Sequence, residues 1–253
     1  MPNSADKNQT THFGYEEVPV AEKQQRVRQV FMSVASRYDL MNDVMSLGSH
    51  RLIKRFAVEL SALRSGHKVL DLAGGTGDFS IRFSSIVGKQ GHVVLADINE
   101  SMLQIGRDRV IDQGISNNVT FAQVNAESLP FVDNSFDCVC IAYGLRNVTD
   151  KAAALESMQR VLKPGGRVLI LEFSKPTNRL LGKAYAAYST LWPLAGKLIT
   201  GDSESYRYLV ESIQLHPDQE TLLQMMHAAG LQNCKYHNVM SGICAIHLGF
   251  KPL

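Results

Sequence analysis

The feature that most limits the possible folds is an alternation of strand-like and helix-like patterns that begins at Lys68. Amphipathic helical patterns at 77–88, 99–114 and 150–166 connect most of the strand-like runs. Parallel strands need crossover connections of this kind. The sequence therefore predicts an α/β fold with a mostly parallel sheet and helices on both of its faces. Five apolar runs have the length and composition of its buried strands, at residues 68–73, 92–98, 119–125, 136–144 and 166–174.

The pattern changes after Ser174. Residues 177–213 carry two or three helical patterns, which we interpret as an insertion, and a further helix is predicted at 216–230. The chain closes with two strand-like runs, 231–240 and 242–250, separated by a turn. We expect these runs to form an antiparallel hairpin that brings the sheet to seven strands.

Length and composition suit one domain. The chain has 253 residues, of which 45% are hydrophobic and 20% charged, which is enough apolar material for a sizeable core. Residues 1–24 are predicted to be a flexible tail, and residues 25–253 a single domain in which 25–65 form a helical cap over the ligand edge of the sheet. The 26 basic and 24 acidic residues are mixed along the chain, so nothing indicates a nucleic-acid partner.

Other classes of protein are disfavoured as well. The four cysteines lack a CxxC pair, which predicts reduced thiols in the core of a cytoplasmic protein. No HExxH motif or Cys/His spacing indicates a metal site. The most apolar segment, 180–199, is interrupted by Lys183, Pro193 and Lys197, so no membrane span is predicted.

Between the first predicted strand and its helix, the stretch VLDLAGGTGDFS (69–80) places three glycines within four positions. In open parallel sheets, a ligand binds at the turn where a strand passes into its helix. Gly74, Gly75 and Gly77 would bring backbone N–H groups close to such a ligand. A tight turn alone would also use glycine, so the loop by itself leaves both interpretations open.

Two acids indicate what the ligand carries. Asp97 ends the second predicted strand, twenty residues after Gly77, where a carboxylate can accept hydrogen bonds from ribose hydroxyls. Asp71 lies just before the loop, where it would repel a pyrophosphate but could orient an ammonium group. Its alternative role is to cap a turn.

S-adenosylmethionine carries both a ribose and an ammonium group and fits these positions. Its adenine would meet Asn125 and Ala126, after the third predicted strand. NAD is the competing cofactor, because Gly75-x-Gly77-x-x-Ser80 nearly matches the dinucleotide fingerprint. The match fails at the third glycine.

The chain resembles the class I S-adenosylmethionine-dependent methyltransferases, and more closely the ubiquinone/menaquinone biosynthesis C-methyltransferase family. The resemblance implies a Rossmann-like fold and methylation of a ring carbon of demethylmenaquinol and of 2-polyprenyl-6-methoxy-1,4-benzoquinol. The motifs that carry it include FMSVASRYDLMNDVMSLGSHR (31–51), VLDLAGGTGD (69–78), ADINESML (96–103), NAESLPF (125–131), GLRNVTD (144–150), LEFSKP (171–176) and HPDQ (216–219).

The resemblance also implies which residues hold the cofactor. Asp71 and the loop glycines support the contacts. Position 142 is a further contact in the family, where it is often serine; here it is Ala142, so a hydroxyl bond at this position is absent. The remaining implied contacts are Thr76, Asp97, Asn125 and Ala126.

Methylation of a ring carbon requires an electron-rich ring, which ionisation of a quinol hydroxyl provides. Arg146 is the first candidate for stabilising the phenolate, because a permanent cation at the carboxyl end of a strand faces the ligand crevice. A structural ion pair is the alternative for this residue. Asn147 could orient the acceptor or shape the turn. His50 and His216 are candidate bases, because imidazole titrates near neutral pH.

A polyprenyl quinol is mostly tail, so its cleft should be apolar, and residues 185–199 suit the lining. Trp192, with apolar neighbours and flanking lysines, makes this segment a candidate contact with the inner face of the membrane. Two rival functions stay open. One is an NAD-dependent oxidoreductase, and the other is a non-catalytic subunit in an assembly of quinone-biosynthesis enzymes.

Overall fold

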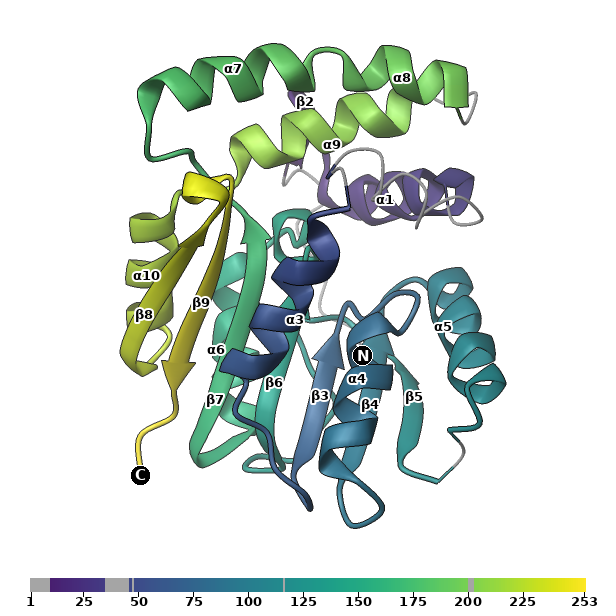
Figure 1. Ribbon diagram of the computed structural model, residues 1–253, viewed down its shortest axis with the longest axis vertical. Coiled ribbons are helices and arrows are strands. Elements are labelled where there is room, and N and C mark those ends of the chain that lie inside the picture. The colour runs from purple at the N-terminus through teal and green to yellow at the C-terminus, as the bar shows by residue number, and fades with distance from the viewer. Residues whose placement is uncertain (1–9, 35–45, 47, 116, 200–202) are drawn as a thin grey trace.

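A seven-stranded sheet forms the centre of the molecule (Figure 1). The computed structural model describes residues 10–34, 46, 48–115, 117–199 and 203–253. The strand order is β5-β4-β3-β6-β7-β9-β8. Strands β3 to β7 pair in parallel, and β9 pairs antiparallel with both β7 and β8, which confirms the predicted sheet. The strands are β3 (Lys68–Leu72), β4 (His92–Asp97), β5 (Val119–Gln123), β6 (Phe136–Ala142), β7 (Leu162–Phe173), β8 (Gln232–Val239) and β9 (Cys244–Phe250).

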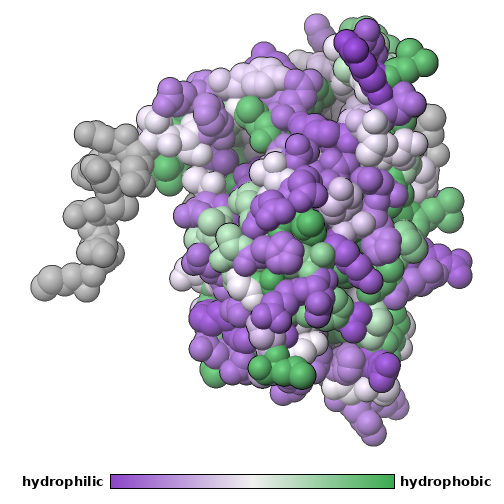
Figure 2. Space-filling model, turned by 90° about the vertical axis from the view of Figure 1, so that its left-hand side faces the viewer, coloured by the Kyte–Doolittle hydropathy of each residue, from purple (hydrophilic) through white to green (hydrophobic). Residues whose placement is uncertain are grey.

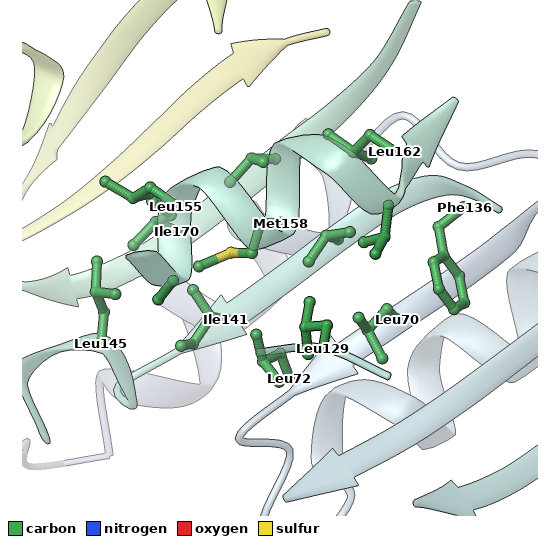
Figure 3. Packing of buried hydrophobic residues seen from close by; sticks show 14 of the residues in the cluster. Leu70, Leu72, Leu129, Phe136, Ile141, Leu145, Leu155, Met158, Leu162 and Ile170 are labelled. Atoms are coloured by element: carbon green, nitrogen blue, oxygen red, sulfur yellow. The ribbon is translucent and has the colours of Figure 1, made fainter. Parts of the chain in front are cut away.

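Helices cover both faces of the sheet (Figure 1). On one face lie α3 (His50–Leu60), α4 (Asp78–Val87) and α5 (Glu100–Asp112), and on the other lie α6 (Lys151–Val161) and α10 (Gln219–Ala228). Successive strand residues point to opposite faces. Leu70 therefore packs in the cluster that contains Met158 of α6 (Figure 3), whereas Val69 packs in the cluster that contains Phe83 of α4.

A further helical layer lies beyond the carboxyl ends of the parallel strands (Figure 1). It consists of α1 (Val20–Val34), α7 (Arg179–Ser189), α8 (Trp192–Ile199) and α9 (Glu204–Leu215). The last three helices occupy the predicted insertion. A small core of Trp192, Tyr206, Leu209 and Ile213 holds α8 and α9 together. On the molecular surface, hydrophobic residues are scattered among hydrophilic ones on the face that Figure 2 shows.

The prediction of a flexible tail is wrong for residues 10–24. β1 (Thr10–Phe13) and β2 (Glu16–Pro19) form an antiparallel hairpin, and α1 begins at Val20. The Phe13 ring stacks on Tyr208 of α9 at a centroid distance of 4.3 Å, and Val18 is buried. Residues far along the chain thus order this segment. Residues 1–9 of the predicted tail lie outside the described residues.

The boundary between α6 and β7 also differs from the prediction. α6 ends at Val161 and β7 begins at Leu162, whereas the sequence pattern placed the change at residue 166. Pro164 forces the residue before it into an extended conformation. Leu162 pairs with Phe136 of β6, so the segment joins the sheet four residues early.

Candidate active site

The loop between β3 and α4 needs glycine for two physical reasons. Gly75 has a φ angle of +51° and Gly77 of +80°, in the left-handed region that favours glycine. A Cβ atom on Gly77 would lie 3.0 Å from Leu95 Cδ1 and 3.4 Å from the carbonyl oxygen of Gly106. The tight turn therefore brings α4 and α5 close to the strand end.

Asp97 lies at the end of β4 and holds this loop. Its Oδ2 atom accepts a hydrogen bond from the Gly75 N–H at 2.9 Å, and its Oδ1 atom accepts one from the Asn99 N–H at 2.8 Å. The residue is 8% exposed. Burial, which disfavours the charged form, raises the pKa of Asp97 to about 6.

Asp71 lies deeper, near the end of β3. It is buried and accepts a hydrogen bond from the Ser80 hydroxyl at 2.6 Å. Burial raises the pKa of Asp71 to about 7, and the bond from Ser80 partly opposes the shift. The Asp71 carboxyl is therefore poised to change its charge near neutral pH when a charged group arrives.

A cavity of about 460 Å³, which we call the Asp97 cavity, opens beside this carboxylate. It is lined by the ends of β4, β5 and β6 and by α1. Lys23 of α1 is among the lining residues, and burial lowers its pKa to about 8. The predicted site residues that line it are Gly75, Asp97, Asn125, Ala126, Ala142 and Asn147.

A second cavity, of about 230 Å³, lies on the other side of the loop. We call it the aromatic cavity because many of its lining side chains are aromatic, among them Tyr143, Phe173, Tyr185, Tyr188, Trp192 and Tyr208. The predicted site residues that line it are His50, Asp71, Gly74, Gly75, Thr76, Ala142 and Arg146.

The two cavities meet at the glycine loop and the end of β6. Ala73, Gly75, Ala142 and Tyr143 line both of them. A ligand that fills the Asp97 cavity and passes the loop therefore reaches the aromatic cavity, where a second molecule can meet it. This geometry suits transfer of a group between two bound molecules.

Arg146 is held in a fixed orientation at the wall of the aromatic cavity. Its Nη1 atom donates to Oε1 of Glu172 at 3.0 Å and to the carbonyl oxygen of Tyr143. The Arg146 backbone N–H donates to Oε2 of Glu172 at 3.1 Å. The side chains of Arg146 and Glu172 are 5% and 2% exposed. Arg146 is therefore ion-paired, as the structural alternative expected, and it also lines the cavity, so its role as the phenolate stabiliser stays a prediction.

Glu172 was not identified from the sequence, although the signal was present. Like Asp97, it is an acid at the end of an apolar strand, and acids at such positions sit at the ligand edge of a parallel sheet. Asn147, next to Arg146, lines the Asp97 cavity instead and accepts a hydrogen bond from the Tyr208 hydroxyl at 3.0 Å.

The candidate bases are placed very differently. His50 lines the aromatic cavity, with its Nδ1 atom 2.8 Å from the Ser46 hydroxyl. His216 is buried at the end of α9 and lines neither the Asp97 cavity nor the aromatic cavity. Burial and nearby cations lower its pKa to about 2. The structure therefore does not bring His216 to the site, and its imidazole stays neutral.

Gly77 also lines neither cavity, and the structure shows it as part of the turn. Ile53, which follows the HR of the 31–51 motif by two residues, is buried and lines the aromatic cavity. Within the described residues, no group of three His, Cys, Asp or Glu side chains is placed to hold a metal ion.

The residues fit the expected cofactor. A carboxylate has about four acceptor positions, so Asp97 can hold ribose hydroxyls in addition to its two backbone partners. Asp71 and Asp78 line the cavity beside the loop, with Lys54 paired to Asp78 at 2.8 Å. Because Lys54 offsets the charge of Asp78, it is the Asp71 carboxylate that disfavours a pyrophosphate and favours an ammonium group.

Comparison with known proteins identifies a methyltransferase family that matches nearly the whole chain. The model of the ubiE/COQ5 methyltransferase family matches residues 20–251. The chain is 65% identical, over 244 residues, to the ubiquinone/menaquinone biosynthesis C-methyltransferase UbiE of Pseudomonas putida (strain F1), covering 96% of this chain and 95% of that protein. It is 62% identical, over 247 residues, to the UbiE protein of Cellvibrio japonicus, covering 97% and 99%.

A solved structure shows the same fold at low sequence identity. The structure of a SAM-dependent methyltransferase from Aquifex aeolicus aligns with a TM-score of 0.58 and 19% identity, covering 78% of this chain and 88% of that chain. This similarity concerns the fold alone.

Proposed function

The chain belongs to the ubiE/COQ5 methyltransferase family, and from this membership we propose that it methylates a ring carbon of a quinol with S-adenosylmethionine, in ubiquinone and menaquinone biosynthesis. The proposed acceptors are demethylmenaquinol and 2-polyprenyl-6-methoxy-1,4-benzoquinol. The observation that carries the proposal is the meeting of the Asp97 cavity and the aromatic cavity at the glycine loop. One cavity suits a nucleoside and the other suits an aromatic ring.

Most of the predicted cofactor-binding residues have a defined task in this proposal. Asp97 holds the ribose hydroxyls, and Asn125 and Ala126 border the adenine. Gly74, Thr76 and Asp71 face the amino-acid end of the cofactor at the junction with the aromatic cavity. S-adenosylmethionine, when bound, supplies an electrophilic methyl group on a sulfonium centre.

The aromatic cavity prepares the acceptor. Arg146 stabilises the developing phenolate, and Glu172 fixes the plane of the guanidinium through the bond at 3.0 Å. The surrounding rings exclude water and align the quinol with the junction, so part of the rate enhancement comes from orientation. Among the predicted bases, only His50 lines this cavity, and we assign it the ring proton that leaves after methylation.

A direct test uses the purified protein, a reduced quinol and S-adenosylmethionine with a labelled methyl group. The proposal expects the label on a ring carbon, identified by mass spectrometry. Label on oxygen, or binding of NAD in place of S-adenosylmethionine in calorimetry, would overturn it. Cells that lack the protein should accumulate unmethylated quinone precursors. Normal methylation in cells whose only copy is the Arg146→Lys variant would favour the rival function of a non-catalytic subunit.

Cofactor binding at pH 7 is expected to release protons from Asp71. Its pKa of about 7 in the free protein leaves the carboxyl partly protonated, and an adjacent ammonium group favours the ionised form. We expect release of up to about half a proton per bound molecule. The measurement is calorimetry at pH 7 in two buffers of different ionisation enthalpy. Binding enthalpies that do not depend on the buffer would contradict the assignment, and Asp71→Asn should remove most of the dependence.

Contact with the membrane stays a proposal, and the structure corrects its residues. None of the described helices is long and apolar enough to cross a bilayer. Trp192 is only 4% exposed and packs edge-on against Tyr185 and Tyr188, which disfavours it as the contact. Leu191 and Leu194 are 58% and 60% exposed in the same segment. Assembly with other quinone-biosynthesis enzymes also stays a proposal.

Replacing Leu191 and Leu194 together with glutamate should weaken binding to anionic liposomes by about tenfold or more, since each leucine buries apolar area in the membrane interface. Flotation measures the bound fraction. Ile111→Glu is the matched control, because Ile111 is a 53% exposed apolar residue on α5. Equal binding of both variants would show that this segment is not the contact.

A further inference from the structure

A third cavity, of about 210 Å³, adjoins the aromatic cavity and has no role in the function proposed so far. It lies between α7, α9 and the segment that follows β7. Its wall includes Pro176, Gly182 and Val210. We call it the tail cavity. Tyr185 and Trp192 line both this cavity and the aromatic cavity, so these two side chains form the partition between them.

The acceptor of the proposed reaction needs an outlet of this kind. A drug-sized ligand fills a pocket of about 300–1,000 Å³. The aromatic cavity, at about 230 Å³, must hold the quinol ring and the reacting end of the cofactor. A polyprenyl tail therefore has to leave it, and the partition formed by Tyr185 and Trp192 leads directly to further space.

We propose that the tail cavity receives the first isoprene units of the acceptor, and that Tyr185 and Trp192 form a gate between ring and tail. This inference rests on the proposed function. Beyond the gate the walls are mainly apolar, and two of the lining residues, Ala186 and Gln214, are exposed, which points to an outlet there. Ala186 belongs to α7, the helix that precedes Leu191 and Leu194, so the outlet opens next to the proposed membrane contact.

Two polar atoms of the gate are consistent with a bound quinol. The Tyr185 hydroxyl and Trp192 Nε1 are buried and have no hydrogen-bond partner within the described residues. Buried donors of this kind are normally satisfied. In both proposed quinols, a hydroxyl is attached to a carbon next to the one that bears the tail. A tail that passes the gate therefore brings an oxygen within reach of these donors.

Gly182 offers a precise way to close the tail cavity. It lies within α7, and a Cβ atom there would have Pro176 Cβ as its nearest neighbour, at 3.8 Å. This is an ordinary contact distance, so Gly182→Leu fills the cavity without backbone strain. Leucine is also a better helix former than glycine, so a loss of activity would not arise from a weakened helix. Gly182→Ala improves the helix in the same way and leaves most of the cavity open.

The test compares a quinol that carries several isoprene units with the same quinol without a tail. For Gly182→Leu we expect KM for the tailed quinol to rise by about tenfold or more, and kcat/KM for the tailless quinol to stay within about twofold of the wild type. Gly182→Ala should behave as the wild type with both. Equal effects of Gly182→Leu on the two quinols, or no effect on either, would overturn the proposal that Tyr185 and Trp192 form a gate. Failure of the wild type to methylate either quinol would instead overturn the proposed function.

Trp192 provides a second readout that does not require turnover. It is the only tryptophan in the chain, so its fluorescence reports directly on the gate. An oxidised quinone with a tail should quench it saturably, and Gly182→Leu should weaken that binding by about tenfold. Binding of the tailless quinone should not change. A tailed quinone that binds in calorimetry but leaves Trp192 fluorescence unaltered would overturn the proposal.

Discussion

Replacement of Asp97 with alanine is expected to weaken S-adenosylmethionine binding by about 100-fold or more. A hydrogen bond to a charged group contributes about 1.5–3 kcal/mol. Two ribose hydroxyls that donate to one carboxylate therefore account for about 3–6 kcal/mol, and each 1.4 kcal/mol corresponds to about tenfold in affinity. The variant also loses the bonds at 2.9 and 2.8 Å that hold the glycine loop and Asn99. Calorimetry measures the dissociation constant directly.

Two further variants separate the carboxylate from its surroundings. Asp97→Asn keeps the shape of the side chain but loses its charge, so most of the loss in affinity should persist. Asp112→Ala removes an exposed aspartate from α5 and should bind the cofactor as the wild type does. Tight binding by Asp97→Asn would show that the ribose is held elsewhere.

Replacement of Arg146 with lysine is expected to lower kcat by about 100-fold or more, because removal of one group that stabilises developing charge commonly costs about 10²- to 10³-fold. Lysine keeps the positive charge but lacks the planar fork of donors that Glu172 orients. Arg146 lines the aromatic cavity and not the Asp97 cavity. The affinity for S-adenosylmethionine should therefore change little. Steady-state kinetics measures kcat of the variant, and calorimetry measures its affinity for the cofactor.

Replacement of Arg146 with a neutral residue also has a cost in stability. Glu172 would be left as an unpaired carboxylate with a side chain 2% exposed, and breaking a buried pair in this way costs about 3–5 kcal/mol. The double variant Arg146→Met with Glu172→Gln removes both charges together. It should fold and bind the cofactor but fail to methylate the quinol. A double variant with the kcat of the wild type would exclude Arg146 as the phenolate stabiliser.

The local geometry of the proposed cofactor site follows closely from the sequence. The apolar run that ends near Asp71 and the one that ends at Asp97 form adjacent parallel strands, so the two carboxylates reach the same edge of the sheet. The positive φ angles of Gly75 and Gly77 arise within the same short loop. All of these features depend on interactions between near neighbours or on pairing of consecutive strands, which periodicity reveals.

The histidines show where residue type alone misleads. His50 and His216 were equal candidates for the base, because imidazole has the same chemistry at both positions. His50 lines the aromatic cavity, whereas His216 is enclosed at the end of α9. The difference arises from the packing of helices that the sequence pattern does not orient.

The sequence by itself determined the class of fold, the glycine loop and the acids beside that loop, because each depends on short-range backbone geometry. Only the tertiary structure placed Trp192 inside a partition between two cavities, paired Arg146 with Glu172, and docked Phe13 on Tyr208. These contacts join elements that are separated in the chain. Their geometry follows from how whole helices and strands pack, and a local pattern of residue types does not predict that packing.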